Sequence, residues 1–308
     1  MTPYVTRRGL ALLIGLAGLG PAGGRAAEAV RVACKPDTEG RLLGNMIIAM
    51  LNANGIATVD RLGLGGTKII RSAILSGEID IYPEYTGNGA FFFHIDSDPA
   101  WKNAGQGYAK VKALDAAQNH IVWLQPAPAD NTWAIAVRKD VAEQNHLKTL
   151  DDFARWVNGG GAAKIAASAE FVESPAALPA FEAAYGFKLK AAQILTLAGG
   201  NTAATIRAAA EGTSGVNTAM AYGTDGALAT LGMVVLQDTK GVQMVYAPTP
   251  VIREAVLKAH PGIAALLAPV FASLDAPTLR GLNAAIAVNG EDSKQVAAGY
   301  LKQKGFLK

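Results

Sequence analysis

From residue 30 onwards the chain alternates regularly between short apolar runs and amphipathic helical patterns. Apolar runs at residues 30–34, 58–64 and 79–82 are separated by two stretches with apolar side chains at helical spacing. This β-α-β-α-β order predicts an α/β protein with a mostly parallel sheet flanked by helices, because parallel strands need crossover connections between them. Such sheets bind ligands at the carboxyl ends of their strands. The stretch YPEYTGNG stands at one of these ends.

Two proline-rich segments divide the remaining sequence into blocks. QPAPADN at residues 125–131 and APTP at residues 247–250 flank a middle block that again alternates strand and helix patterns. The length of 308 residues also favours two compact units. We therefore predict one lobe from residues 30–130 and 248–308 and a second from residues 131–247. Two crossover strands would form the hinge between the lobes, with a cleft beside it.

Residues 1–29 have the pattern of a cleavable export signal. A basic start with Arg7 and Arg8 precedes an apolar run at residues 10–19, and small residues lead to a cleavage site after Ala29. The run is too short to span a bilayer, which disfavours a membrane anchor, and no later segment is long and apolar enough to do so. We expect the mature protein in the periplasm. The paired arginines leave both twin-arginine and general secretion open.

Charge and cysteine content narrow the possible partners. Removing residues 1–29 takes away three arginines and one glutamate, which lowers the formal net charge from +3 to +1. A chain so close to neutral gives no reason to expect a nucleic-acid partner. Cys34 is the only cysteine, so no internal disulfide can form. Its place in a β-type run is typical of a buried strand residue.

The sequence lacks the motifs of common enzyme classes. It contains no G-x-S-x-G, no H-E-x-x-H, no P-loop and no cysteine pair. The four histidines, at positions 94, 120, 146 and 260, show no metal-ligand spacing. We therefore expect a protein without catalytic activity, metal or cofactor.

Aromatic residues stand out at the predicted strand ends and loops. They are Tyr82, Tyr85, Trp133, Tyr222 and Tyr246. Several rings around one small volume can bind a quaternary ammonium ion, and each desolvated ring contributes about 0.5–2 kcal/mol through cation–π attraction. The residues alone leave a second interpretation open, in which these rings are ordinary buried strand residues.

Four longer stretches have the residue choice and order of a known family. They are LGLGGTKIIRSAILSGEIDIYPEYTGN, DNTWAIAV, AEFVESPAALPAFEAAYGF and QDTKGVQMVYAPTPVI, and GEIDIYPEYTGN is the most specific piece. Over nearly all of its mature length the chain resembles the substrate-binding proteins of osmoprotectant ABC transporters, the OpuAC/ProX/OsmF-like family. The resemblance implies a two-lobed periplasmic-binding-protein fold of type II. It also implies a ligand such as glycine betaine, proline betaine, carnitine or choline, and a membrane permease as partner.

The resemblance assigns an aromatic cage to four positions. The second tyrosine of YPEYTG is Tyr85, and the aromatic residue of DNTWAIAV is Trp133, where relatives usually have tyrosine. The other two rings are Tyr222 and Tyr246. A tryptophan face binds a cation at least as well as a tyrosine face. Tyr82 is left out of the cage, because strand alternation can point it into the lobe.

Relatives that hold a betaine carboxylate use three further positions, which read Lys35, Asn88 and Ser174 in this chain. Lys35 and Asn88 can still donate hydrogen bonds to a carboxylate. Ser174 stands where those relatives have arginine, and serine cannot supply the bidentate cationic fork of arginine. This departure shifts the expected ligand towards choline or another solute with a weaker anionic end. Glu170 and Glu173 lie in the same loop and could face a cation, or they are solvated surface carboxylates.

We therefore expect a monomeric, extracytoplasmic solute-binding protein that captures a quaternary ammonium solute between two lobes and delivers it to a permease. One alternative is a binding protein of the same fold for a different polar or amino-acid-like solute. An extracytoplasmic enzyme is disfavoured by the missing motifs, and a sensory domain without transport partners stays open.

Overall fold

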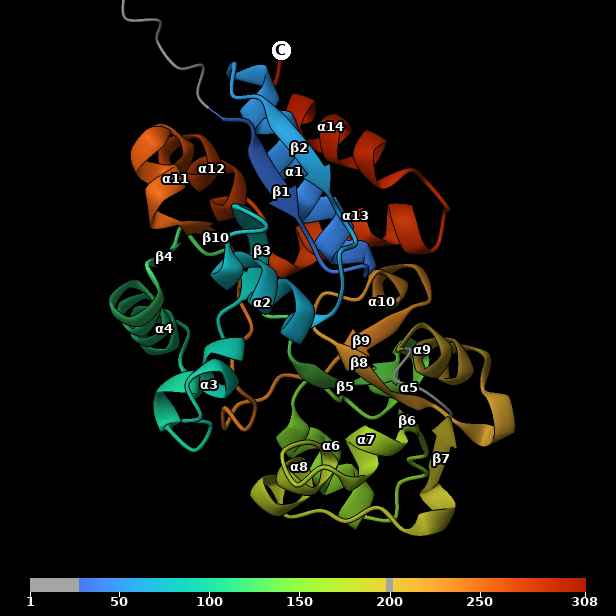
Figure 1. Cartoon of the computed structure of the whole chain (residues 1–308). Helices are drawn as coiled ribbons and strands as arrows, with labels where there is room; N and C mark the ends of the chain where they lie inside the picture. Colours follow the sequence, from blue (N-terminus) through green and yellow to red (C-terminus); the bar gives the residue numbers. More distant parts are fainter. Residues whose placement is uncertain (1–27, 198–201) are drawn as a thin grey trace, which may run out of the picture.

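The computed structural model describes residues 28–197 and 202–308. Two five-stranded sheets form the centres of two lobes, and helices surround each sheet (Figure 1). The strand order is β2-β1-β3-β10-β4 in lobe 1 and β7-β6-β8-β5-β9 in lobe 2. The predicted export signal at residues 1–29 lies, apart from its last two residues, outside the described residues.

Lobe 1 is built from the first and last parts of the chain. Its first part contains β1 (Val30–Ala33), α1 (Thr38–Ala53), β2 (Thr58–Arg61), α2 (Thr67–Ser76), β3 (Ile81–Tyr85), α3 (Asn88–Phe92), a 3-10 turn (Pro99–Lys102), α4 (Ala104–Asn119) and β4 (Ile121–Trp123). Its last part contains β10 (Pro248–Arg253), α11 (Glu254–Ala259), α12 (Ile263–Ala272), α13 (Ala276–Ala287) and α14 (Ser293–Gln303).

Lobe 2 is built from the middle of the chain. It contains β5 (Trp133–Arg138), α5 (Lys139–Gln144), α6 (Leu150–Asn158), β6 (Ile165–Ser168), α7 (Ala169–Glu173), α8 (Leu178–Tyr185), a 3-10 turn (Ala191–Gln193) and β7 (Ile194–Leu197). After the gap in the described residues follow α9 (Thr202–Glu211), a 3-10 turn (Thr213–Gly215), β8 (Thr218–Tyr222), α10 (Gly226–Thr230) and β9 (Met233–Val235).

Both sheets are mixed, and in each of them one strand runs opposite to the other four, which agrees with the mostly parallel sheets predicted from the sequence. In lobe 1, β1 pairs in parallel with β2 and β3, but β10 runs antiparallel to β3 and β4. In lobe 2, β6 pairs in parallel with β7 and β8, but β5 runs antiparallel to β8 and β9. The antiparallel strands β5 and β10 are the first strands after each crossover. Hydrophobic periodicity predicts that a strand exists but not its direction, so the sequence could not reveal this.

Two crossover segments connect the lobes and lie side by side. Residues 124–132 join β4 to β5, and residues 236–247 join β9 to β10. The backbone N–H of Asn131 donates to the carbonyl oxygen of Tyr246 at 3.0 Å, which ties the two segments together. The lobe boundaries at residues 130/131 and 247/248 stay a prediction.

Each lobe has its own apolar core, as the helical spacing of apolar residues predicts. In lobe 1 the buried face of α1, which includes Leu43, Met46 and Ile47, packs with residues of α12. In lobe 2 three phenylalanines from α6, α7 and α8 are fully buried in one core cluster. A capping box starts α6: the Thr149 side chain accepts a hydrogen bond from the backbone N–H of Asp152, and the Asp152 side chain accepts one from the backbone N–H of Thr149.

Within the described residues, no single helix has the length and apolar character needed to cross a membrane. The bent pair formed by α12 and α13, which meet at 92°, passes that test only when the two helices are taken together.

Candidate functional site

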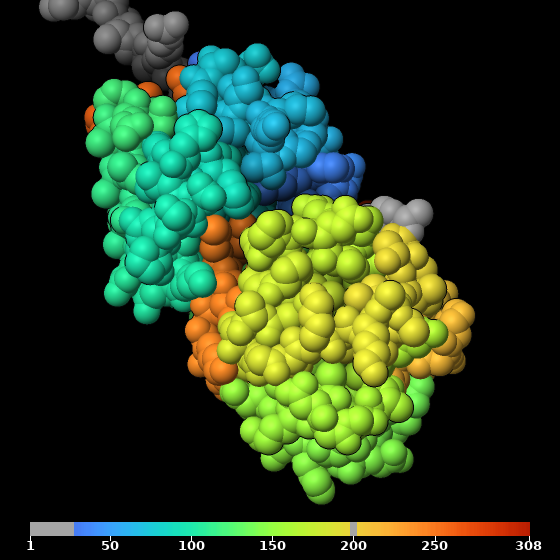
Figure 2. All heavy atoms as spheres, turned by 90° about the horizontal axis from the view of Figure 1, so that it is seen from below, coloured from blue at the N-terminus to red at the C-terminus, as the bar shows by residue number. Residues whose placement is uncertain are grey.

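A cavity of about 780 Å³ lies between the two lobes. Its walls come from the end of β3 and the α3 region in lobe 1, from the starts of β5 and α7 in lobe 2, and from both crossovers. Figure 2 shows the groove between the lobes, with residues of the second crossover along it in orange. Segments far apart in the sequence therefore contribute to one volume beside the crossovers.

All four rings that the sequence assigned to a cage line this cavity. They are Tyr85 at the end of β3, Trp133 at the start of β5, Tyr222 at the end of β8 and Tyr246 in the second crossover. Trp133 and Tyr222 are register partners on neighbouring strands, and the indole N–H of Trp133 donates to the Tyr222 hydroxyl at 3.2 Å. The structure brings the rings together, and their role in holding a ligand stays a prediction.

Tyr82 does not join this group. It is fully buried in the core of lobe 1, as strand alternation allows for a residue three positions before Tyr85. Its hydroxyl donates to Glu84 at 3.0 Å.

Tyr246 is held against lobe 1 although it belongs to a crossover. The Thr86 hydroxyl donates to the carbonyl oxygen of Val245 at 2.9 Å and accepts from the N–H of Ala247 at 3.1 Å. The N–H of Val245 donates to the carbonyl oxygen of Trp101 at 2.8 Å. These bonds on both sides of Tyr246 fix the position of its ring relative to Tyr85.

The glycine after Thr86 is required by this ring. A Cβ added at Gly87 would lie 2.8 Å from the Tyr246 ring, closer than such contacts normally come. The TGNG sequence after Tyr85 therefore lets the ring of Tyr246 lie directly on the backbone of the turn. This close approach explains part of the unusual composition at the end of β3.

The two tyrosines from opposite lobes are neutral phenols at ordinary pH. Burial raises the pKa of Tyr246 to about 12, and the nearby Tyr222 and Asp130 add to the shift. Burial also raises the pKa of Tyr222, with a further contribution from the charge of Glu170. A neutral ring presents its negative face to a cation without a formal charge of its own.

The structure does not bring Lys35 and Asn88 to the cavity wall; both bind Glu84 instead. The Lys35 ammonium lies 2.6 Å from Glu84 Oε1, and the Asn88 amide donates to the same oxygen at 2.7 Å. The backbone N–H of Tyr85 donates there as well, at 2.8 Å. Glu84 is fully buried, so its charge requires these donors. The Lys35 ammonium also lies 4.8 Å from the centre of the Tyr85 ring.

Ser174 does line the cavity, from the C-terminal end of α7. Its hydroxyl accepts a long hydrogen bond of 3.4 Å from the N–H of Ala176. Among the described residues that line the cavity, Lys102 is the only cation, and Asp96 and Glu170 are the carboxylates. The wall thus offers aromatic faces and negative charge more than positive charge.

Sequence reasoning missed two polar side chains of the first crossover that line the cavity. The hydroxyl oxygen of Thr132 and the amide oxygen of Asn131 are buried and have no hydrogen-bond partner within the described part of the chain. Unpaired buried polar atoms are costly, so both are available to a ligand or to water. Their position in DNTW, directly before Trp133, could have suggested that they lie near the cavity. The sequence does not show which way a loop side chain points, so it could not establish this.

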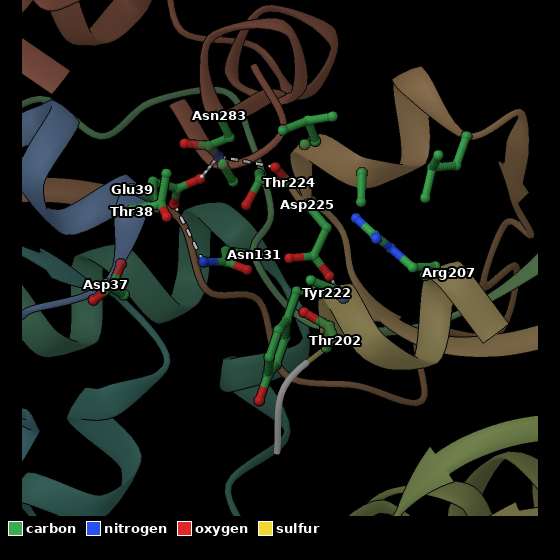
Figure 3. Close-up of a pocket in the computed structure, with 16 residues that line it drawn as sticks. Asp37, Thr38, Glu39, Asn131, Thr202, Arg207, Tyr222, Thr224, Asp225 and Asn283 are labelled. Carbon is green, nitrogen blue, oxygen red and sulfur yellow. Dashed lines mark hydrogen bonds between the residues drawn. The ribbon is translucent and has the colours of Figure 1, made fainter. Parts of the chain in front are cut away.

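The cavity adjoins a buried hydrogen-bond network centred on Glu39, at the start of α1. The Tyr85 hydroxyl donates to Glu39 at 2.8 Å, and the side-chain amides of Asn131 and Asn283 donate at 3.2 and 2.8 Å. Figure 3 shows Glu39, Asn131 and Asn283 in the wall of a second, smaller cavity of about 400 Å³. Burial raises the pKa of Glu39, and the hydrogen bonds offset this only partly. No cation joins the network among the residues that the structure describes.

Among residues 28–197 and 202–308, no group of His, Cys, Asp or Glu is arranged to hold a metal ion. The residues that line the site can surround a small cation with rings and offer hydrogen bonds from the first crossover.

Comparison with known proteins identifies the class. Residues 28–303 match the family described as the substrate binding domain of the ABC-type glycine betaine transport system. The chain belongs to this family. It is therefore a substrate-binding component of an ABC transporter and not an enzyme, and its fold is the two-lobed α/β fold of type II periplasmic binding proteins.

Individual relatives are similar over nearly their whole length. The glycine betaine-binding protein YehZ of Escherichia coli (strain K12) is 62% identical over 284 residues, which cover 92% of this chain and 93% of that protein. A glycine-betaine-binding protein of Pseudomonas aeruginosa is 31% identical over 303 residues, which cover 96% and 94%. The solved structure of apo YehZ from Escherichia coli matches with a TM-score of 0.85 and covers 91% of this chain and 100% of that one.

Proposed function

We propose that this protein captures a quaternary ammonium solute of the glycine betaine or choline class in the aromatic cavity and delivers it to a membrane permease. The observation that carries the proposal is the convergence of Tyr85, Trp133, Tyr222 and Tyr246 on one cavity between the lobes. The printed names of the two relatives, both glycine betaine-binding proteins, support the same ligand class.

The rings recognise the cation because a quaternary ammonium has no N–H with which to form strong hydrogen bonds. Ring faces at about 0.5–2 kcal/mol each supply the attraction instead. Glu170, which lies near enough to Tyr222 to affect its titration, adds negative charge on the same wall. A primary ammonium would bind less well, because it would lose its hydration without gaining acceptors for all its protons.

The anionic end of a betaine finds less support in this cavity than its cationic end. Lys35 and Asn88 are bound to Glu84, and Ser174 stands where the family resemblance implies an arginine in relatives that hold a carboxylate. Lys102 and the hydroxyl of Thr132 are among the donors on the wall. We therefore expect choline to compete well with glycine betaine.

Delivery follows from closure of the lobes around the solute. Rings from both lobes line the cavity, so a ligand that touches both binds the closed form better and shifts the population towards it. The closed form is then the one that a permease of the inner membrane engages. This role places the protein in the periplasm, as a monomer.

Titration calorimetry with choline and glycine betaine tests the proposal. A neutral isostere of choline, 3,3-dimethylbutanol, serves as the control, because it has the same shape without the charge. We expect binding of at least one quaternary amine and at least tenfold weaker binding of the isostere. If no quaternary amine binds while an amino acid raises the melting temperature, the alternative of a polar-solute binder is correct.

Two ring variants locate the site. Trp133→Ala and Tyr222→Ala are each expected to weaken binding at least tenfold, which corresponds to about 1.4 kcal/mol. Tyr222→Phe is the matched control, because it keeps the ring and loses only the hydroxyl. Unchanged affinity in an alanine variant would remove that residue from the cage.

A further inference from the structure

The smaller cavity, of about 400 Å³, is separate from the aromatic cavity in most of its walls. Only Asn131 and Tyr222 line both cavities. The other walls of the smaller cavity come from the start of α1, from α9 and α10 of lobe 2, and from α13 (Figure 3). Its volume lies within the range of sites that hold small molecules. The proposed function makes no use of this cavity.

The charges on the wall of the smaller cavity are unbalanced. Among the described residues that line it, Asp37, Glu39 and Asp225 carry carboxyl groups, and Arg207 is the only cation. In Figure 3, Arg207 lies on the opposite side of the cavity from Glu39. Glu39 is 4% exposed, and its hydrogen bonds within the described part of the chain come from neutral groups. A cation in the cavity would compensate this buried carboxyl group.

Two amide oxygens on the same wall lack donors. Asn283 is 5% exposed, and its amide nitrogen donates both to Glu39 at 2.8 Å and to the carbonyl oxygen of Thr224 at 2.9 Å. These two bonds fix the orientation of the amide. Its oxygen, like that of Asn131, is buried and has no hydrogen-bond partner among the described residues. Unpaired buried acceptors are costly, so a ligand that brings N–H groups would be favoured.

Asn131 and Asp225 place their acceptors on opposite sides of the cavity. Figure 3 shows the Asn131 amide oxygen and the Asp225 carboxyl group pointing toward one another. Two acceptors cannot bond to each other directly, whereas a donor between them can bond to both. Burial raises the pKa of Asp225, although the N–H of Tyr222 and the charge of Arg280 counteract the shift. The ionised form of Asp225 would therefore also gain from a cation beside it.

The remaining part of the wall is apolar. It consists of two side chains from α10 and the residue that follows it and two from the end of α13 and the residue that follows it: Ala227, Leu231, Ala287 and Val288. Val288 is 40% exposed, so the apolar part of the cavity reaches the surface. The cavity thus combines acceptors and negative charge with an apolar part that is open to solvent.

We propose that the smaller cavity binds a primary alkylammonium compound. Its ammonium group lies among Glu39, Asn131 and Asp225, and its alkyl chain lies against the apolar part of the wall. A primary ammonium carries three N–H donors, which match the unpaired acceptors. A quaternary ammonium carries none and would leave those acceptors unpaired, so the two cavities select opposite kinds of cation. The inference goes beyond the proposed function and does not depend on it.

Calorimetry with n-propylammonium chloride, tetramethylammonium chloride and potassium chloride tests the proposal at constant ionic strength. We expect n-propylammonium to bind with a dissociation constant of about 1 mM, as suits a ligand with so few atoms. Potassium chloride should give no binding heat. If potassium binds as well as n-propylammonium, the cavity holds an inorganic cation and the proposal is wrong. Failure of tetramethylammonium to bind contradicts only the proposed function.

Variants assign each ligand to its cavity. Asp225→Asn removes one carboxylate and puts an amide in its place, so it should weaken n-propylammonium binding at least about tenfold. Asp140→Asn, at an exposed carboxylate of lobe 2 that pairs with Arg138, is the matched control and should bind like the wild type. Trp133→Ala should leave n-propylammonium binding unchanged, because Trp133 lines only the aromatic cavity. Wild-type affinity in Asp225→Asn, or lost affinity in Trp133→Ala, would overturn the proposal.

Ala287→Phe is a second variant that leaves every polar group in place. Ala287 is exposed at the end of α13, so the larger ring fills the apolar part of the cavity from its solvent side. It should weaken n-propylammonium binding at least about fivefold. Ala113→Phe, at an exposed position of α4, is the control for an added surface ring. Equal affinities of these two variants would show that the alkyl chain does not lie where the proposal puts it.

Discussion

Two buried glutamates flank Tyr85, and their surroundings differ. Glu84 lies beside the backbone of Tyr85 and pairs with the Lys35 ammonium at 2.6 Å. Glu39 lies at the hydroxyl end of the same ring and receives hydrogen bonds from neutral groups, the Tyr85 phenol and the amides of Asn131 and Asn283. Both carboxyl groups are almost completely shielded from solvent.

The two glutamates show two ways in which the protein compensates for burying a carboxyl group: an ion pair within one lobe, and a network of neutral donors beside a crossover. The partners of Glu84 all come from lobe 1, so its ion pair strengthens one rigid body. Glu39 is bonded to groups of lobe 1 and of the first crossover, and a side-chain hydrogen bond with Thr224 of lobe 2 also lowers its pKa; Asn283 in turn holds the loop at Thr224. A network of neutral donors costs less to rearrange than an ion pair, which suits a position beside moving parts.

The largest expected effect on stability comes from removing the cation that pairs with Glu84. Lys35→Met removes the cation and leaves Glu84 buried with an uncompensated charge, so we expect a loss of about 3–5 kcal/mol in unfolding free energy. Urea denaturation at neutral pH measures it. Lys110→Met is the matched control, because its partner Asp98 is partly exposed and such pairs contribute about 0–1 kcal/mol. Equal losses in both variants would show that Glu84 does not depend on its cation.

A third buried carboxyl group, that of Asp130, extends the comparison between Glu84 and Glu39. Asp130 accepts a hydrogen bond from the N–H of Tyr246 and, among the described residues, has no cationic partner. Burial raises the pKa of Asp130 from 3.8 to about 6, and the nearby Asp238 adds to the shift. The protonated form is therefore favoured in the fold, and its stabilising contribution is present below about pH 4 and lost as the pH rises through 6.

Asp130→Asn keeps the acceptor for Tyr246 and removes the titration. We expect the variant to be more stable than the wild type by about 1–2 kcal/mol at pH 8, and to lose this advantage at pH 4. Urea denaturation at both pH values checks the prediction. Asp140→Asn, an exposed partner of Arg138, should show no such gain at pH 8. A gain that is the same at pH 4 and pH 8 would mean that charge is not the cause.

Replacing Glu39 in the network of neutral donors should have a smaller effect on stability, and this effect should depend on pH. Glu39→Gln turns one acceptor into a donor that faces other donors, so it should cost about 1 kcal/mol at pH 4. Because burial raises the pKa of Glu39, the wild type loses stability as the pH rises through that raised value, whereas the variant does not titrate. The cost should therefore shrink between pH 4 and pH 8. A cost that grows with pH would show that ionised Glu39 stabilises the fold.

The smallest expected effect is a change in ligand affinity when a cation is added at Ser174 in the wall of the aromatic cavity. Ser174→Arg introduces the residue that the family resemblance implies at this position in carboxylate-binding relatives, so glycine betaine should bind about twofold to fivefold more tightly, and choline should not. Ser174→Gln, which adds length without charge, is the control. Calorimetry with both ligands measures the ratio, and an equal gain for choline would mean that the added arginine does not meet a carboxylate.

The sequence predicted the elements of the site better than their partners. Tyr85, Trp133, Tyr222 and Tyr246 could be placed at strand ends and loops because strand patterns and turn residues are local signals, and the family resemblance implied that they form one cage. The ion pair of Lys35 and Glu84 could not, because its members stand 49 positions apart and meet only when the sheet has formed.

The same limit applies to the start of α1 and to the sheets. Glu39 stands in the first turn of α1, where acidic residues are common at the surface because they interact favourably with the helix dipole. Its burial depends on Asn283, which follows it by 244 positions. Strand direction likewise depends on the path of the chain after each crossover. The hydrophobic periodicity of the sequence therefore could not predict that β5 and β10 run opposite to their neighbours.

The anchoring of Tyr246 to Thr86 and Trp101 has a consequence for the speed and cost of capture. In the proposed function, Tyr85 and Tyr246 would move together with lobe 1 as one half of the cage, and the hydrogen-bonded pair Trp133 and Tyr222 would move with lobe 2 as the other half. One rigid rotation then assembles four walls around a solute, and no ring has to be ordered separately. Such preorganisation keeps the entropic penalty of binding small.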